Sequence, residues 1–176
     1  MTTTEAPKTE GPGKWEVQET EALRKYSLES GYSYLIKEEI PDQAFDIFVD
    51  ACKHGVPCLC ITREYPEKVK DRHELKGVPF LWLSMDQEKS YARDPSNIAL
   101  LYSDIKTFVS DNKGCMVLFT GMEYLVSQNG FAKVLKLFQH INDKIAVTES
   151  TLIASISPLT LPEPDLKMLE KEMRSF

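Results

Sequence analysis

The feature that most constrains the fold is a regular alternation of short apolar runs with amphipathic segments, which begins at Gly31. The apolar runs are rich in β-branched and aromatic residues and predict strands. They cover residues 32–37, 57–62, 79–85, 115–120 and 151–156. None of these runs alternates cleanly between polar and apolar residues, which is typical of strands that helices cover on both faces.

The segments between the runs have helical periodicity and helix boundary signals. Proline suits the first turn of a helix, and glycine suits the position just after its end. The expected helices begin near Pro41, Pro66, Asp94-Pro95, Gly130 and Pro162, and the last of them runs to about Arg174. The order predicts an α/β fold, a three-layer sandwich around a mainly parallel five-stranded sheet. Ligands of such folds bind beyond the carboxyl ends of the strands.

The chain length of 176 residues allows one domain of ordinary size. Residues 1–13 are rich in Thr, Pro, Gly and Glu, and predict a disordered tail. Residues 14–30 are expected to form a helical or linker segment that packs on the domain edge or on a partner. Residues 31–176 are then the single α/β domain.

Composition excludes several classes of function. The net charge is −6, and the chain has no basic strip of the kind that binds nucleic acid. No window approaches the roughly 18–20 apolar residues of a membrane helix, and the N-terminus has no apolar signal region. Three of the four cysteines, Cys58, Cys60 and Cys115, lie in apolar runs. Buried free thiols of this kind favour a reducing, cytoplasmic location.

The first strand–turn–helix unit lacks the residues of a phosphate site. Phosphate-binding turns need glycines, and a P-loop adds Lys followed by Ser or Thr. Here residues 37–44 read KEEIPDQA, with no glycine and with carboxylates that would repel a phosphate. The fourth strand ends in Thr120, where an active nucleotide hydrolase would need a carboxylate to hold magnesium. The turn and this strand end therefore both lack the groups of a nucleotide-hydrolysing site.

Several motifs resemble the archaeal family called domain of unknown function 835. They are YLI at 34–36, CITR at 60–63 with YPE at 65–67, and GMEYL at 121–125 with NGF at 129–131. The similarity covers about residues 28–172. It implies a RecA/KaiC-like core whose P-loop has been lost, and a chain that stands alone or accompanies sensory and histidine-kinase-like modules. The family carries no established catalytic residues, and its members often have Asp at the position of Thr120.

Polar residues near the predicted carboxyl ends of the strands are the candidate ligand or partner surface. They are Glu38, Glu39, Arg63, Glu64, Ser84, Thr120, Glu123 and Tyr124. Arg63 could pair with Glu38, Glu39 or Glu123. Such pairs would build either a docking site or an ion-pair network that only holds the edge of the sheet.

Cysteine-based sites are less favoured. Cys58 and Cys60 lie two residues apart on a strand, so both should point to the same face of the sheet. Their spacing to Cys52 and His54 fits no standard zinc site, which favours core packing. We therefore expect no metal and no cofactor.

Two functions are compatible with these features. The first is a non-catalytic signalling or protein-interaction module, without enzyme activity, that binds a signalling protein or a copy of itself. The alternative is a sensor of a small ligand at the strand ends that uses Arg63 with Ser84 and Thr120. A divergent enzyme is the third possibility, and the residues favour it least.

Overall fold

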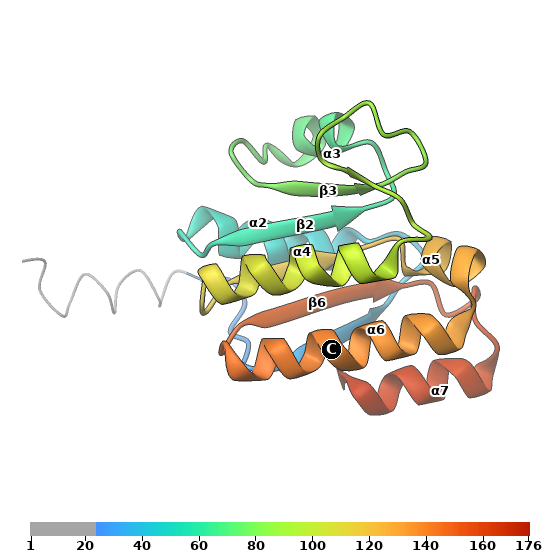
Figure 1. Ribbon diagram of the computed structural model, residues 1–176. Coiled ribbons are helices and arrows are strands. Elements are labelled where there is room, and N and C mark those ends of the chain that lie inside the picture. The colour runs from blue at the N-terminus through green and yellow to red at the C-terminus, as the bar shows by residue number, and fades with distance from the viewer. Residues whose placement is uncertain (1–23) are drawn as a thin grey trace, which may run out of the picture.

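A parallel β-sheet organises residues 24–176, the part of the chain that the computed structural model describes (Figure 1). The strand order is β4-β3-β2-β5-β6-β1-β7, and every neighbouring pair is parallel. The strands are β1 (Ser33–Lys37), β2 (Cys58–Thr62), β3 (Phe80–Leu83), β4 (Ala92–Arg93), β5 (Met116–Phe119), β6 (Thr151–Ile156) and β7 (Arg174–Ser175). The five strands expected from the apolar runs are thus confirmed.

The expected strand number was wrong, because the sheet has seven strands. The two additional strands, β4 and β7, are two residues long and form the edges of the sheet. A two-residue strand contains no apolar run that a sequence pattern could reveal. β7 also ends the last helix earlier than expected, since Arg174 and Ser175 pair with Tyr34 and Leu35 of β1.

Helices cover both faces of the sheet. They are α2 (Asp42–Lys53), α3 (Pro66–His73), α4 (Ile98–Asp111), α5 (Met122–Asn129), α6 (Phe131–Val147) and α7 (Glu163–Glu172). All except α5 were expected. Only two side chains of α5 are buried, Met122 and Leu125, and the helix has no polar side-chain cap. Its sequence therefore carries little helical periodicity, and its first residues read instead as the end of a strand.

Two hydrophobic cores result, one on each face. Helices α2 and α3 pack over the smaller core, which contains Phe48 and Val69. Helices α4, α5, α6 and α7 pack over the larger core, where the rings of Phe119 and Phe138 meet edge to face with centroids 4.8 Å apart. Figure 1 shows α4 and α6 side by side on this second face. The expected three-layer arrangement is confirmed.

The segment before β1 packs against α2. Arg24 and His54 both lie within salt-bridge distance of Asp50, and the hydroxyl of Tyr26 donates to Asp46 at 2.5 Å. Residues 24–30, the described end of the helical or linker segment expected over 14–30, contain no helix. The rest of that segment and the tail expected over 1–13 lie outside the described residues.

Candidate functional site

The topology of the sheet marks a point where two neighbouring strands send the chain in opposite directions. After β2 the chain crosses to β3 on one side, whereas after β5 it crosses to β6 on the other. The loops that follow β2 and β5 therefore diverge. In open α/β sheets, ligands bind at such a switch point, outside the carboxyl ends of the strands. Arg63 follows β2 at this point, and Thr120 and Gly121 follow β5.

Arg63 is the residue that joins the elements around the switch point. Its guanidinium group lies over the ring of Tyr124, 4.3 Å from the ring centroid, and donates to the carbonyl oxygen of Leu83 at 2.9 Å. Its own carbonyl oxygen accepts a hydrogen bond of 3.2 Å from the indole of Trp82. Arg63 thus connects the ends of β2 and β3 with α5.

Gly121 allows Arg63 to lie this close to β5. Its φ angle is +91°, a region that glycine adopts without strain. A β-carbon at position 121 would lie 2.9 Å from the Cβ of Arg63 and 3.1 Å from its backbone nitrogen. The close packing of these two loops therefore depends on the missing side chain.

Three aromatic side chains form what we call the aromatic cluster: Tyr65, Trp82 and Tyr91. Trp82 joins this cluster to Arg63 through the hydrogen bond from its indole. The ring of Trp82 is 5.1 Å from that of Tyr65 and 6.4 Å from that of Tyr91. The ammonium group of Lys70 lies 5.8 Å from the ring of Tyr91. Partial burial and the neighbouring Tyr65 raise the pKa of Tyr91 to about 12, so its hydroxyl stays protonated.

Sequence reasoning missed the aromatic cluster. Its members come from the loop before α3, from β3 and from the loop before β4, and only the tertiary fold brings them together. The sequence held one weak signal, the position of Tyr65 shortly after the predicted strand end at Thr62.

The hydroxyl groups at the strand ends are already used within the protein. The Thr120 hydroxyl donates to the carbonyl oxygen of Ile61 at 3.1 Å, and Thr120 is 8% exposed. The Ser84 hydroxyl accepts from the backbone N–H of Asp86 at 3.0 Å, and Ser84 is 5% exposed. Both hydroxyl groups therefore hold the backbone at the carboxyl ends of the strands and do not point into solvent.

The carboxylates next to the switch point have partners other than Arg63. Glu64 forms an exposed ion pair with Arg72 of α3. Glu123 was an expected partner of Arg63, as were Glu38 and Glu39. Glu123 accepts a hydrogen bond of 2.9 Å from the backbone N–H of Ser157. Glu123 and Tyr124 also belong to the first turn of α5 and not to a strand end, which corrects the expected placement of both.

Glu38 occupies the N-terminus of α2. One carboxylate oxygen accepts from the backbone N–H of Gln43 at 3.0 Å, and the other accepts from that of Ala44 at 3.2 Å. The second oxygen also accepts from the hydroxyl of Ser155 at 2.9 Å. Free N–H groups and the helix dipole make this the position that binds a phosphate in phosphate-binding folds. In this protein a side chain of the chain itself fills it.

The eight predicted site residues therefore do not form one site. Arg63, Ser84, Thr120 and Tyr124 surround the switch point, with Glu64 at its margin and Glu123 on the adjacent turn. Glu38 follows β1, and β5 and β6 separate β1 from β2 in the sheet. Glu39, beside it, is exposed and has no hydrogen-bond partner among residues 24–176.

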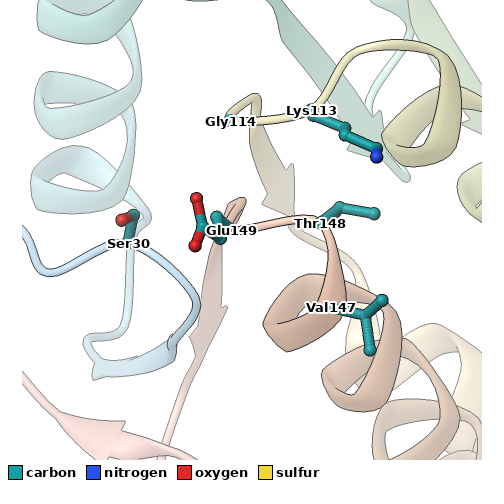
Figure 2. Close-up of a pocket in the computed structure, with 6 residues that line it drawn as sticks. All are labelled: Ser30, Lys113, Gly114, Val147, Thr148 and Glu149. Atoms are coloured by element: carbon teal, nitrogen blue, oxygen red, sulfur yellow. The ribbon is translucent and has the colours of Figure 1, made fainter.

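A cavity of about 460 Å³ lies at the opposite edge, where β1, β5 and β6 begin. Six residues line it: Ser30, Lys113, Gly114, Val147, Thr148 and Glu149 (Figure 2). In Figure 2 the Glu149 carboxylate points toward Ser30, whereas the Lys113 amine points away from it. The charged groups of this cavity therefore do not converge on one point, as the groups of a specific ligand site would.

Two further findings concern the described residues alone. Between Arg24 and Phe176, no helix is both long and apolar enough to cross a membrane. The same residues contain no group of three or more His, Cys, Asp or Glu side chains that could hold a metal ion.

Comparison with known proteins identifies a family. The model of the family described as "Protein of unknown function (DUF835)" matches residues 37–173. No curated protein matches the chain. The match includes α2 to α7 and all eight predicted site residues. The chain belongs to the DUF835 family.

Proposed function

We propose that this protein is a non-catalytic protein-interaction module of a signalling system. Its core would be a RecA/KaiC-like domain in which a carboxylate has replaced the bound phosphate. The observation that carries this proposal is the position of Glu38. Its two carboxylate oxygens accept hydrogen bonds from the backbone N–H groups of Gln43 and Ala44, one each. A nucleotide phosphate would have to displace this carboxylate, and would meet its negative charge.

The surface beside the switch point supports a protein partner. Tyr, Trp and Arg are enriched among the residues that contribute most binding energy at protein interfaces. Arg63 is exposed, the aromatic cluster is half-buried, and Met85 nearby in sequence is 62% exposed. We propose that Arg63 and the aromatic cluster together bind the partner, which is a sensory or histidine-kinase-like signalling protein or a second copy of this chain. Burial of the free thiols Cys58, Cys60 and Cys115 supports a cytoplasmic location.

The nucleotide part of the proposal is tested by thermal melting with and without magnesium and ATP, and with inorganic phosphate. We expect no change in melting temperature. A ligand at about 100 times its Kd would stabilise the folded state by roughly 2.7 kcal/mol. A shift of that size with magnesium and ATP would mean that the chain binds nucleotide despite Glu38, and the proposal would be wrong.

The interaction part is tested by sedimentation velocity over a range of concentrations and by capture from a lysate of the source organism. The wild-type chain should either self-associate or retain a defined signalling protein. Arg63→Ala should weaken that association, whereas Val147→Ala, at the opposite edge of the sheet and 77% exposed in wild type, should not. A wild-type chain that stays monomeric and captures no protein would contradict the proposal.

A small-ligand sensor is the second candidate, because an exposed guanidinium group lies on an aromatic ring at the switch point. Such a group suits a ligand that carries an anionic group and an apolar part. The melting panel therefore extends to small metabolites, and Arg63→Ala should abolish any shift that one of them causes. A shift that Arg63→Ala leaves unchanged would reject this role for Arg63.

A further inference from the structure

Two cysteines meet where α2 ends and β2 begins. Cys52 is the second-last residue of α2, and Cys58 is the first residue of β2. The chain between them turns at Gly55, which has a φ angle of +79°. Both side chains pack with the smaller core, where Cys58 is buried and Cys52 is partly exposed. The fold therefore brings two thiols of unequal accessibility to one place.

The two thiols are neighbours that line the same cavity. Their interaction lowers the pKa of Cys52 and raises that of Cys58. The Cys58 thiol donates to the carbonyl oxygen of Val56 at 3.2 Å. A thiolate is the reactive form of cysteine. The arrangement therefore favours a thiolate at Cys52 beside a protonated thiol at Cys58.

Small molecules can reach this pair. Both cysteines line a cavity of about 440 Å³ at the start of β2 and β3. Cys52 also lines a smaller cavity of about 130 Å³. Lys76 lines both cavities, and Lys53 and Glu74 line the smaller one.

The other two cysteines lack these properties. Cys60 is fully buried, and burial raises its pKa well above the usual value. Cys115 is 1% exposed, and its thiol donates to the Ser150 hydroxyl at 3.3 Å. Buried thiols of this kind are inert, so they serve as internal comparisons for the pair.

We propose that Cys52 and Cys58 form a redox-active dithiol site, with Cys52 as the attacking thiol and Cys58 as the resolving thiol. The oxidant is the disulfide of a low-molecular-mass thiol, RSSR. The Cys52 thiolate attacks one sulfur of RSSR, forms a mixed disulfide and releases RS⁻, which takes up a proton. Cys58 then loses its proton and attacks the Cys52 sulfur, which forms the Cys52–Cys58 disulfide and releases the second RS⁻. Two protein thiols are oxidised, and one RSSR is reduced to two RSH. In a reducing compartment the protein disulfide would be transient.

The experiment treats the reduced full-length chain with oxidised glutathione, blocks the remaining thiols with N-ethylmaleimide in denaturant and maps the peptides by mass spectrometry. We expect a disulfide between Cys52 and Cys58, with Cys60 and Cys115 blocked as free thiols. The Cys58→Ala variant should retain glutathione on Cys52, because no resolving thiol remains. The Cys52→Ala variant should take up no glutathione, and Cys115→Ala should behave as the wild type.

A second measurement needs no variant. Limited labelling of the folded wild-type chain with iodoacetamide should modify Cys52 before the other three cysteines. The proposal is wrong if Cys60 or Cys115 reacts first. It is also wrong if oxidised glutathione leaves both Cys52 and Cys58 reduced, or if the wild-type chain accumulates glutathione on Cys52 without the internal disulfide.

Discussion

At the scale of single residues, Gly121 controls how closely the loops after β2 and β5 approach. Gly55 has a similar backbone conformation, with φ angles of +79° at Gly55 and +91° at Gly121. A β-carbon at Gly55 would meet no atom within 4 Å, whereas one at Gly121 would meet the Cβ of Arg63 at 2.9 Å. A comparison of alanine substitutions at the two positions therefore distinguishes the cost of backbone strain from the cost of steric overlap.

Gly55→Ala should lower the free energy of unfolding by about 1–2 kcal/mol, the cost of a left-handed conformation. Gly121→Ala should lower it by roughly a further 1–3 kcal/mol, because overpacking adds to that cost. Urea denaturation of both variants measures the difference. Equal losses would mean that the loops adjust freely and that Gly121 does not determine the position of Arg63.

The ring of His73 makes stability depend on pH. It stacks on Phe45, with centroids 4.3 Å apart and planes 5° from parallel. Burial lowers the pKa of His73, and the nearby charge of Arg72 lowers it further. The unfolded chain therefore binds a proton at this residue before the folded chain does. The free energy of unfolding should consequently decrease as pH falls through the ordinary histidine range, near pH 6.5, toward the lower pKa of the folded state.

The contribution of His73 is measured by urea denaturation at about pH 8 and about pH 5.5, on either side of the histidine range. The loss of stability between these values should be smaller for His73→Phe, which keeps an aromatic ring against Phe45 but cannot titrate. His140→Phe leaves His73 in place and should show the wild-type loss. If His73→Phe shows the same loss as wild type, the pH dependence arises at other groups.

At the scale of secondary structure elements, Glu38 stabilises the start of α2 from outside the helix. Glu38→Ala should lower the free energy of unfolding by about 0.5–2 kcal/mol, the usual cost of losing a side-chain cap. Glu39→Ala changes the exposed neighbour and should stay within about 0.5 kcal/mol of wild type. Urea denaturation at neutral pH compares the two. Equal effects would mean that Glu38 does not act as the cap.

The elements that the sequence predicted share one property, which is a strong local pattern. β6 is buried on both faces, with Leu152 and Ala154 in the larger core and Ile153 in the smaller one, and it reads as a continuous apolar run. Elements β4, β7 and α5 depend instead on their neighbours. β7, for example, pairs with β1. Directly after β7, the backbone N–H of Phe176 donates to the carbonyl oxygen of Leu35 in β1.

The residues of the candidate site also fall into two groups, those with a local sequence signal and those whose contacts depend on the tertiary fold. The role of Glu38 could be inferred from the glycine-free turn, because a carboxylate near a helix N-terminus is a local feature. The partner of Arg63 could not be inferred. An ion pair with Glu123 was a reasonable expectation, but the carboxylate of Glu123 accepts from Ser157 and the guanidinium group lies on Tyr124. That choice depends on how α5 meets the end of β6, which no local pattern encodes.

At the scale of the whole molecule, the two cores share the central strands. β5 contributes Leu118 to the smaller core and Phe119 to the larger one. Neither core can lose its packing without disturbing the strands of the other. We therefore expect residues 31–176 to unfold in one cooperative transition, as small single domains usually do.

A Trp15→Phe background tests this, because Trp82 of β3 is then the remaining tryptophan. Its fluorescence and the far-ultraviolet circular dichroism of the helices should give coincident urea transitions. Phe48→Leu changes the smaller core and Phe138→Leu the larger one, and both side chains are fully buried. For each variant, both signals should report the same decrease in the free energy of unfolding, about 1–3 kcal/mol. Leu159 is 79% exposed in wild type, so Leu159→Ala should change the value from either signal by no more than about 0.5 kcal/mol. A Phe138→Leu variant that moves the dichroism transition but not that of Trp82 would show that the two faces of the sheet unfold separately.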